Sequence, residues 1–428
     1  MPNSVNKVIN MKITPFSFIH CADLHLDSPF EGLHTIAPEI ANVLRDATFK
    51  SFENIIDIAI CEKVDFLIIA GDVYDGADRS LHAQWRFFQA LRKSKLQCFV
   101  AHGNHDPLSG WEAGLISPDG VHKFDGNNVE CALAMRGDEK LAYVYGISYP
   151  SRETRENLAL RFPQEKNVLF SIGVLHCNVG GYSEHENYAP CSIDDLCKCG
   201  IDYWALGHVH TRQVLNENKP YIIYPGNTQG RSIRESGERG CYLVKVDDTG
   251  TVSAEFMLTD VVRWFVEEVS ISDIDTIDAL IDALSGIKDE IRSRADGRNA
   301  VLRLCLTGRG ELHKKIRQSE LDITQVLREG EKERRPFVWV ESIQINTRLA
   351  VDIQSRRQVE DFVGEFLKTT ESLRSNTDVE STMRNMLNEP SEHSIIAKEL
   401  DVLTREELLS ILEDAETMGL DWLLEEED

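Results

Sequence analysis

The stretch Asp65–Gly76 reads DFLIIAGDVYDG, and its pattern decides the fold class of this 428-residue chain. Phe66–Ala70 is an uninterrupted apolar run, which predicts a short strand buried on both faces. Gly71 and Asp72 follow at once, so the predicted strand ends beside a carboxylate. The amphipathic segment Ala41–Cys61 precedes this strand and predicts a helix. Buried strands that alternate with helices indicate an α/β protein.

The same succession of an apolar run and polar residues recurs four times in the first 260 residues. The further examples are Ile13–His20 before Asp23, Cys98–Ala101 before Gly103-Asn104-His105, Val168–Leu175 before His176, and Tyr203–Leu206 before Gly207-His208. In open α/β sheets the ligand site lies at the carboxyl ends of the strands. We therefore expect these polar side chains to converge.

Five motifs together form a candidate metal centre. In chain order they are Asp23-Leu24-His25, Gly71-Asp72-Val73-Tyr74-Asp75, Gly103-Asn104-His105-Asp106, His176, and Gly207-His208-Val209-His210. Each motif alone is weak evidence, since a lone histidine is more often a core or surface residue than a ligand. Together they offer imidazole, carboxylate and amide groups without a thiolate, a set that suits divalent transition metals. Two such metals about 3.5–4 Å apart can clamp a phosphate and activate a water.

The series of motifs resembles the calcineurin-like metallophosphoesterase superfamily over residues 11–260. The resemblance implies a sandwich of two mixed β-sheets flanked by helices. It also implies the metal ligands, which are Asp23, His25 and His210 for the first metal, Asn104, His176 and His208 for the second, and Asp72 as a bridge. His105 matches the histidine that contacts the phosphate in that superfamily. It is expected to act as a general acid or to stabilise charge on the phosphoryl group.

Two further positions near the motifs have more than one interpretation. Asp75 either orients His105 or another ligand, or only caps the following turn. His185, in the segment SEHEN, either reaches the substrate or is an ordinary surface residue. His20, three residues before Asp23, is interpreted as a buried, hydrogen-bonded core histidine.

Smaller details favour the nuclease branch of the superfamily. The phosphatase signatures GDxVDRG and GNHE match poorly, because this chain has GDVYDG and Asp106 in place of the glutamate. The segments Phe18–Leu33, His176–Pro190 and Tyr224–Ser232 resemble DNA repair exonucleases of the SbcD/YhaO type. That resemblance implies a manganese-dependent DNA exonuclease, with some single-strand endonuclease action. It also implies a homodimer and an SMC-like ATPase partner of the SbcC type. Iron or zinc would fit the same ligands.

The chain is expected to contain three regions. They are a phosphoesterase domain at 11–260, a small α+β capping domain at 261–350, and a helical region at 351–428 that could dock the ATPase. The capping region carries a basic cluster, interpreted either as a solvated face or as a surface for DNA or a partner. Its members are Lys314, Lys315, Arg317, Arg328, Lys332, Arg334 and Arg335. Within the helical region, Gln354–Leu373 and Arg405–Met418 are amphipathic and predict helices.

Charge and composition bound the remaining possibilities. The formal net charge is −25, and Asp401–Asp428 contributes −10 of it, so DNA binding requires a local positive path. No apolar run is long enough to span a membrane, and the short polar start Met1–Asn10 lacks the core of a secretion signal. With ten scattered cysteines, these features predict a cytoplasmic protein with reduced thiols. The alternatives are a small-molecule or cyclic-nucleotide phosphodiesterase, and a non-catalytic scaffold.

Overall fold

The computed structural model describes residues 13–28, 38–181, 187–375, 379, 381–382 and 403–425. The chain divides into two compact units, each of which is considered by itself. The first unit comprises Met1–Val266, Lys288–Arg303 and Arg328–Glu341, and the second comprises Glu267–Ile287, Leu304–Leu327 and Ser342–Asp428.

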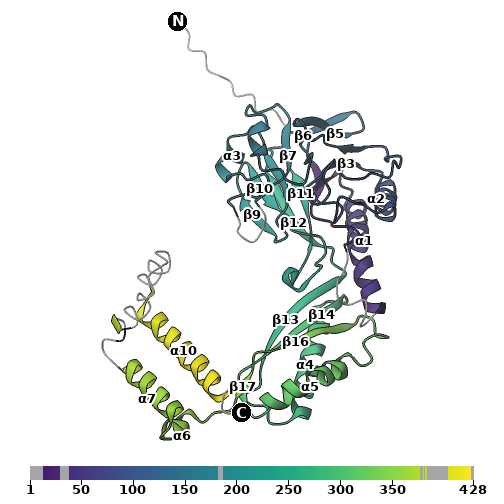
Figure 1. Cartoon of the computed structure of the whole chain (residues 1–428). Helices are drawn as coiled ribbons and strands as arrows, with labels where there is room; N and C mark the ends of the chain where they lie inside the picture. Colours follow the sequence, from purple (N-terminus) through teal and green to yellow (C-terminus); the bar gives the residue numbers. More distant parts are fainter. Residues whose placement is uncertain are drawn as a thin grey trace. The chain divides into compact units, whose positions relative to one another are not determined.

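The first unit contains two six-stranded mixed sheets (Figure 1). The first sheet has the order β12-β11-β1-β2-β3-β4, with β1 Phe16–Cys21, β2 Phe66–Ala70, β3 Gln97–Ala101, β4 Val121–Lys123, β11 Gly240–Val246 and β12 Val252–Leu258. The second has the order β5-β6-β7-β8-β10-β9, with β5 Glu130–Arg136, β6 Glu139–Gly146, β7 Phe170–His176, β8 Tyr203–Gly207, β9 Gln213–Asn216 and β10 Tyr221–Tyr224. β1, β2 and β3 run parallel, as do β6, β7 and β8, which places their carboxyl ends at common edges.

Alternate residues of the central strands enter different hydrophobic cores. Phe18 and Ile68 of the first sheet and Val174 of the second belong to the core that both sheets build. Their neighbours Ile19 and Leu67 belong to a separate core that also contains residues of the helices. Because both faces are covered, these strands read as continuous apolar runs rather than as an alternating pattern.

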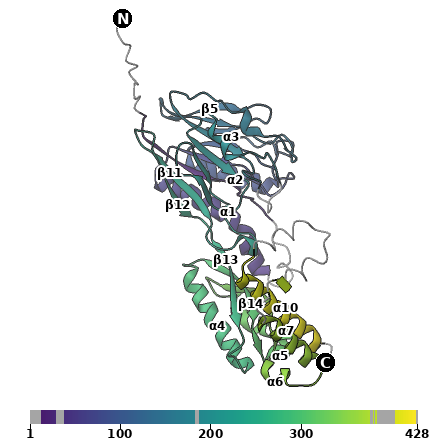
Figure 2. The same cartoon turned by 90° about the vertical axis from the view of Figure 1, so that its left-hand side faces the viewer.

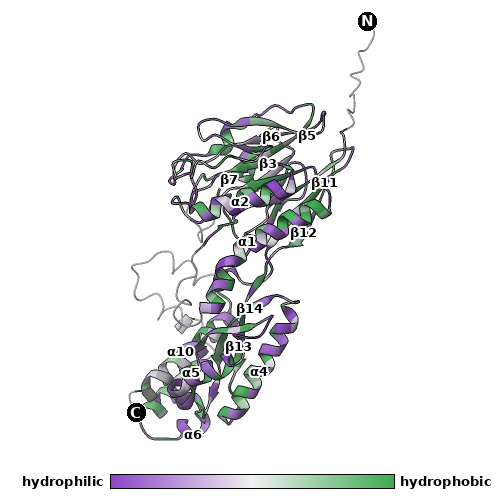
Figure 3. Ribbon diagram, turned by 90° about the vertical axis from the view of Figure 1, so that its right-hand side faces the viewer, coloured by the Kyte–Doolittle hydropathy of each residue, from purple (hydrophilic) through white to green (hydrophobic). Residues whose placement is uncertain are grey.

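Two long helices cover the outer face of the first sheet. α1 spans Pro38–Cys61 and α2 spans Leu81–Ser94, and residues of both enter the core with β1 and β2. The hydroxyl of Ser80 accepts a hydrogen bond from the N–H of Ala83 and so caps α2. Figure 3 shows hydrophilic and hydrophobic residues mixed along both helices, as expected when one face of each is buried. The short α3, Ile193–Cys197, packs in a third core on the second sheet.

The remaining elements follow residue 261. β13 Val262–Ser270, β14 Asn299–Thr307 and β16 Val338–Ile345 form a three-stranded sheet, accompanied in the chain by α4 Ile277–Arg294 and α5 His313–Arg328. β15 Arg309–Gly310 pairs with β17 Arg348–Leu349. In the second unit, α6 Ile353–Arg357, α7 Phe362–Ser375 and α10 Arg405–Glu425 lie together in Figures 1 and 2.

The predicted fold class is confirmed: the protein is α/β, with two mixed sheets flanked by helices. One helix prediction was wrong. The segment Gln354–Leu373 is not continuous, because α6 ends at Arg357 and α7 begins at Phe362. Between them the Asp361 carboxylate accepts a hydrogen bond from Gly364 N–H, as the start of a new helix requires. The boundaries at residues 260 and 350 stay a prediction.

Candidate metal centre

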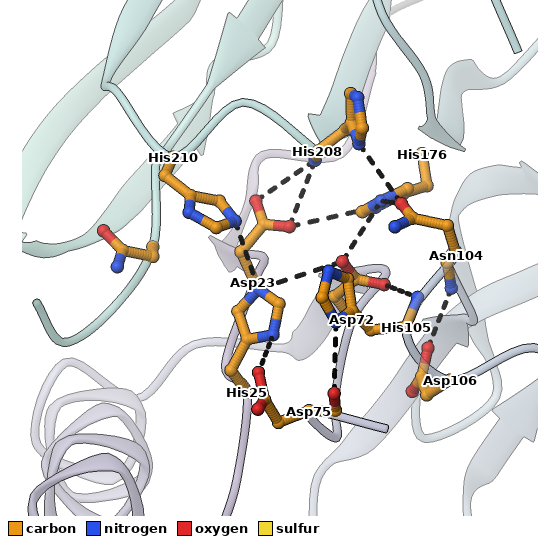
Figure 4. Close-up of polar contacts among 12 residues, drawn as sticks. Asp23, His25, Asp72, Asp75, Asn104, His105, Asp106, His176, His208 and His210 are labelled. Atoms are coloured by element: carbon orange, nitrogen blue, oxygen red, sulfur yellow. Dashed lines mark hydrogen bonds and ion pairs between the residues drawn. The ribbon is translucent and has the colours of Figure 1, made fainter. Parts of the chain in front are cut away.

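The ends of five strands bring the candidate ligands together (Figure 4). In the first sheet, Asp23 and His25 follow β1, Asp72 follows β2, and Asn104 and His105 follow β3. In the second sheet, His176 ends β7, whereas His208 and His210 follow β8. Because these strands are neighbours within their sheets, the polar side chains gather at one place.

The distances show how tightly the seven proposed ligands converge. His25 Nε2 lies 3.1 Å from His210 Nε2, and Asn104 Oδ1 lies 3.0 Å from His176 Nε2 and 3.2 Å from His208 Nδ1. Asp72 Oδ2 lies between these groups, 3.8 Å from His25 Nε2 and 3.5 Å from His176 Nε2. Three overlapping triplets have ligand atoms within 4.8 Å of one another: Asp23, His25 and His210; His25, Asp72 and His105; Asp23, Asp72 and His176.

The electrostatics of this cluster are unfavourable without cations. Burial, aided by the neighbouring carboxylate of Asp72, raises the pKa of Asp23 well above its usual value. Burial also raises the pKa of Asp72 to about 6. It lowers the pKa of His176 to about 4 and, together with the charge of Arg231, lowers the pKa of His25. Carboxylate, amide and imidazole acceptors thus face one another in a buried space, which is the donor set that divalent cations would satisfy.

Backbone strain accompanies the convergence. Asp23, His25 and Asp72 have φ of 52°, 44° and 49°, and His208 has φ of 103°, conformations that non-glycine residues rarely adopt. Strained backbone of this kind concentrates at functional sites.

Two glycines leave space for the side chains of candidate ligands. A Cβ at Gly71 would lie 2.1 Å from His176 Nδ1, and one at Gly103 would lie 2.3 Å from Asp72 Oδ1.

His105 lies at the edge of the cluster. Its backbone N–H donates to Asp72 Oδ1 over 3.0 Å, and its ring centroid is 4.8 Å from that of His25. The ring nitrogen Nδ1 lies 3.1 Å from the carbonyl oxygen of Asp75. Because a carbonyl oxygen only accepts hydrogen bonds, Nδ1 carries the proton, and Nε2 is the atom free to exchange one.

Asp75 contacts two site histidines rather than only the following turn. Its carboxylate oxygen Oδ1 lies 3.0 Å from His25 Nδ1 and accepts a hydrogen bond from Arg231 over 2.6 Å, while its backbone carbonyl holds His105. His185 lies outside the described residues. Tyr188 is buried in the third core, with its ring 6.1 Å from that of His208.

The interpretation of His20 as a core histidine is confirmed. The residue is fully buried, its Nδ1 lies 2.9 Å from the Tyr203 hydroxyl, and its Nε2 lies 3.2 Å from the Leu206 carbonyl. Burial lowers its pKa to about 3. Although it stands only three residues before Asp23, its contacts are therefore those of a neutral imidazole.

Sequence reasoning missed two supporting acids. Asp106 accepts hydrogen bonds from Val73 N–H and Gly103 N–H and pairs with His102, which ties together the loops that carry Asp72 and Asn104. Its only sequence signal is its place in the motif Gly103-Asn104-His105-Asp106. Burial by itself would raise the pKa of Asp106, but the charge and hydrogen bond of His102 outweigh it and lower that pKa.

Glu235 is the second missed acid, and no motif marks it. Its carboxylate lies 2.8 Å from His210 Nδ1 and 3.1 Å from the Arg231 guanidinium. Burial alone would raise the pKa of Glu235, but the hydrogen bond from His210 and the charge of Arg231 hold it well below the usual value. The carboxylate is therefore ionised and stands directly behind a candidate ligand.

Comparison with known proteins agrees with this geometry. Residues 16–212 match the model of the calcineurin-like phosphoesterase family, and residues 264–348 match that of the middle domain of metallophosphoesterase YhaO. The chain is 34% identical over 409 residues to the metallophosphoesterase YhaO of Bacillus subtilis, covering 94% of this chain and 97% of that protein. The chain belongs to the YhaO family of calcineurin-like metallophosphoesterases. It is a metal-dependent phosphodiesterase.

More distant relatives of this YhaO family member carry nuclease and repair names. The chain is 29% identical over 238 residues to the DNA double-strand break repair protein Mre11 of Aeropyrum pernix, covering 52% of this chain and 56% of that protein. It is 22% identical over 255 residues to the SbcD component of the nuclease SbcCD of Bacillus subtilis, covering 51% and 63%. Among the described residues, no helix is long and apolar enough to cross a membrane.

Proposed function

We propose that this enzyme hydrolyses phosphodiester bonds of DNA as a two-metal exonuclease in DNA repair, with single-strand endonuclease action as a secondary activity. The observation that carries the proposal is the convergence of seven candidate ligands at the strand ends, with His105 at their edge. The similarity to a nuclease component and to double-strand break repair proteins supports DNA as the substrate class.

The contacts support a division of the ligands into two sets. Asp23, His25 and His210 would hold one metal, and Asn104, His176 and His208 the other, with Asp72 shared by both. Manganese is the metal we propose, although iron or zinc would fit the same groups. When bound, the two ions would neutralise phosphate charge and lower the pKa of water toward about 7.

His105 would exchange a proton with the reacting oxygen through Nε2. Asp75 fixes the ring by accepting a hydrogen bond from Nδ1 at its backbone carbonyl. The Asp72 carboxylate holds the backbone of His105 in place as well. In this arrangement His105 serves as the general acid that protonates the leaving oxygen or as a donor that stabilises the phosphoryl group.

The acidity of the chain agrees with a partner that supplies part of the DNA-binding surface. We propose an SMC-like ATPase of the SbcC type in that role, because a chain of net charge −25 needs help to attract a phosphate backbone.

The basic cluster of the capping region provides less positive surface for DNA than its number of Lys and Arg residues indicates. Arg328 donates to the carbonyls of Val340 and Glu341 and stacks on Trp339, which is a packing role.

We propose that the enzyme is a homodimer. Leu81 and Trp85, one turn apart on α2, are about half exposed, and so is Trp111, whose N–H donates to the Ala77 carbonyl before that helix. Large apolar side chains exposed together are typical of an interface.

The ten free cysteines fit a reducing compartment, and we propose that the enzyme is located in the cytoplasm.

The test is hydrolysis of end-labelled linear DNA by the purified full-length chain, with Mn²⁺ and with chelator. Asp72→Asn and His105→Ala variants run in parallel, with thermal unfolding to show that both are folded. Manganese-dependent cutting by the wild type, lost in both variants, is the expected result. Cutting of a small chromogenic phosphodiester but not of DNA, even with an ATPase partner present, would favour a small-molecule phosphodiesterase. Bound metal without hydrolysis of either substrate would favour a scaffold.

A further inference from the structure

The backbone of His210 is fixed by the segment between β10 and β11. Asn227, which is fully buried, donates its backbone N–H to the His210 carbonyl over 3.2 Å. The Arg239 guanidinium donates to the same carbonyl over 2.5 Å and to Asn227 Oδ1 over 2.9 Å. Asn227 lies in Tyr224–Ser232, a segment that supplies none of the seven candidate ligands. Its contacts indicate that the segment instead holds one of those ligands in place.

The ring of His210 is held by Glu235. Nδ1 of the ring lies 2.8 Å from Glu235 Oε1, whereas Nε2 lies 3.1 Å from His25 Nε2, on the side of the candidate ligands (Figure 4). Because a carboxylate accepts hydrogen bonds and donates none, Nδ1 carries the proton and donates a hydrogen bond to Glu235. Nε2 of the neutral ring is then the unprotonated nitrogen, as a metal ligand must be.

Glu235 is fixed in turn by Asn227 and Arg231. Oε2 accepts hydrogen bonds from Asn227 Nδ2 over 2.9 Å, from Arg231 N–H over 2.7 Å and from Arg231 Nε over 3.4 Å. Oε1 accepts one from Arg231 Nη2 over 3.1 Å in addition to the one from His210. Only 8% of Glu235 is exposed, so rotation of the carboxylate away from His210 would break these hydrogen bonds where water could not replace them.

We propose that Glu235 is a positioning residue that fixes His210 as the tautomer with the proton on Nδ1 and so turns a lone pair on Nε2 toward the metal. The inference rests on the proposed function, in which His210 is a metal ligand. A carboxylate behind a ligating imidazole fixes the tautomer and ring orientation and increases the basicity of the nitrogen that faces the metal. A neutral histidine in water prefers the proton on Nε2, so the hydrogen bond to Glu235 reverses the intrinsic preference of the ring.

The tautomer of His210 can be measured in the metal-stripped full chain, without any hydrolysis. Long-range ¹H–¹⁵N NMR spectra of protein labelled with ¹⁵N-histidine distinguish the two tautomers at mildly alkaline pH, where an imidazole is neutral. The signals of His210 are those missing from the spectrum of His210→Ala. In the wild type they should be those of the tautomer with the proton on Nδ1.

Glu235→Gln should reverse this tautomer. The single oxygen of the glutamine is expected at the position of Oε2, where three donors meet, so that its NH₂ group faces His210 Nδ1. Nδ1 must then accept a hydrogen bond, and the proton moves to Nε2. Mn²⁺ binding, followed by the electron paramagnetic resonance signal of free Mn²⁺, should weaken by about 10- to 100-fold at the site that His210 serves.

A matched control separates positioning from stability. Glu331 is also a buried glutamate, and it accepts hydrogen bonds from Arg292 and from Val338 N–H rather than from a candidate ligand. Glu331→Gln should leave the tautomer of His210 and the affinity for Mn²⁺ unchanged. If Glu235→Gln does not fold, the wild-type spectrum alone still tests the inference, because it reports the tautomer directly.

The outcomes are distinguishable. A wild-type His210 with its proton on Nε2 would overturn the inference while leaving the metal centre in place. An unchanged tautomer or an unchanged Mn²⁺ affinity in folded Glu235→Gln would overturn it as well, and so would an equal loss of affinity in Glu331→Gln. A wild-type chain that binds no Mn²⁺, Fe²⁺ or Zn²⁺ would instead remove the proposed function together with this inference.

Discussion

Two buried charged clusters in the first unit have opposite hydrogen-bonding arrangements. Asp260 is buried, and its carboxylate faces donors, with Arg263 Nε at 2.8 Å and Arg298 Nε at 3.2 Å. In the candidate metal centre the ligand atoms instead face one another, as His25 Nε2 and His210 Nε2 do at 3.1 Å. The comparison teaches that buried charge alone does not indicate a functional site. Carboxylate, amide and imidazole ligand atoms that converge on one buried space do, because an added cation can satisfy all of them at once.

The same isosteric change should therefore have opposite consequences in the two clusters. Removal of a carboxylate charge from the metal centre weakens function and spares the metal-free fold. Removal of one from the Asp260 cluster weakens the fold and spares function. Substitutions in each cluster and addition of metal test this contrast, beginning with the largest effect.

Asp23→Asn should lower metal-dependent phosphodiester hydrolysis by about 10³-fold, since it removes an anionic metal ligand and so weakens binding of a cation that would neutralise phosphate charge. The unfolding temperature of the metal-free protein should not fall, because asparagine keeps an oxygen for His208 N–H and removes a buried charge. Hydrolysis rates and thermal unfolding in chelator measure the two effects. A metal-free variant that unfolds much earlier than the wild type would show that Asp23 has a structural role and would break the contrast.

Asp260→Asn should lower the free energy of unfolding by about 3 kcal/mol, because the buried Arg263 would keep only the more distant, half-exposed Glu238 as a charged partner, at 3.7 Å. Denaturant unfolding in chelator measures this loss. Hydrolysis per folded molecule and Mn²⁺ affinity should equal those of the wild type. Reduced Mn²⁺ affinity in the folded variant would mean that the two clusters are coupled.

Addition of Mn²⁺ at about 100 times its dissociation constant should stabilise the wild type by about 2.7 kcal/mol for each site filled. The gain appears as a higher unfolding temperature and should disappear when chelator is added. Asp260→Asn should retain the gain, whereas Asp23→Asn should lose the share that comes from the site formed by Asp23, His25 and His210. Equal gains in both variants would indicate that Mn²⁺ binds elsewhere.

The smallest effect on stability is expected at His20, a buried imidazole whose hydrogen-bond partners are neutral. It is intermediate between the metal centre and the Asp260 cluster. Its folded pKa of about 3 lies below the unfolded value of about 6.5, so protonation of the unfolded chain favours unfolding as the pH falls below 6.5. Wild type should therefore lose up to about 1.4 kcal/mol per pH unit relative to His20→Gln. At neutral pH the variant should be about 1 kcal/mol less stable, because its hydrogen bonds are altered.

Denaturant unfolding of both proteins in chelator from pH 7 to pH 4 measures this difference. A constant difference across that range would show that His20 is protonated equally in the folded and unfolded chains. Mn²⁺ affinity at neutral pH should be the same in both, since the contacts of His20 are with Tyr203 and Leu206.

Much of the candidate site could be read from local sequence because its residues follow apolar runs at fixed offsets. Asp72 and His176 are examples: each stands at the end of a strand that is buried on both faces. Glu235 could not be found in this way. It precedes β11 in a short 3₁₀ turn, and it reaches His210 only after the chain has folded back.

The sequence by itself determined the fold class and the kinds of groups at the strand ends, because burial of a strand leaves a continuous apolar run in the local sequence. Only the tertiary structure decided which groups meet. His25 and His210 are 185 residues apart, and the carboxylates behind them come from separate loops joined by Arg231. The physical reason is that side-chain hydrogen bonds between distant loops depend on how two sheets pack, and that packing leaves no periodic pattern in either loop.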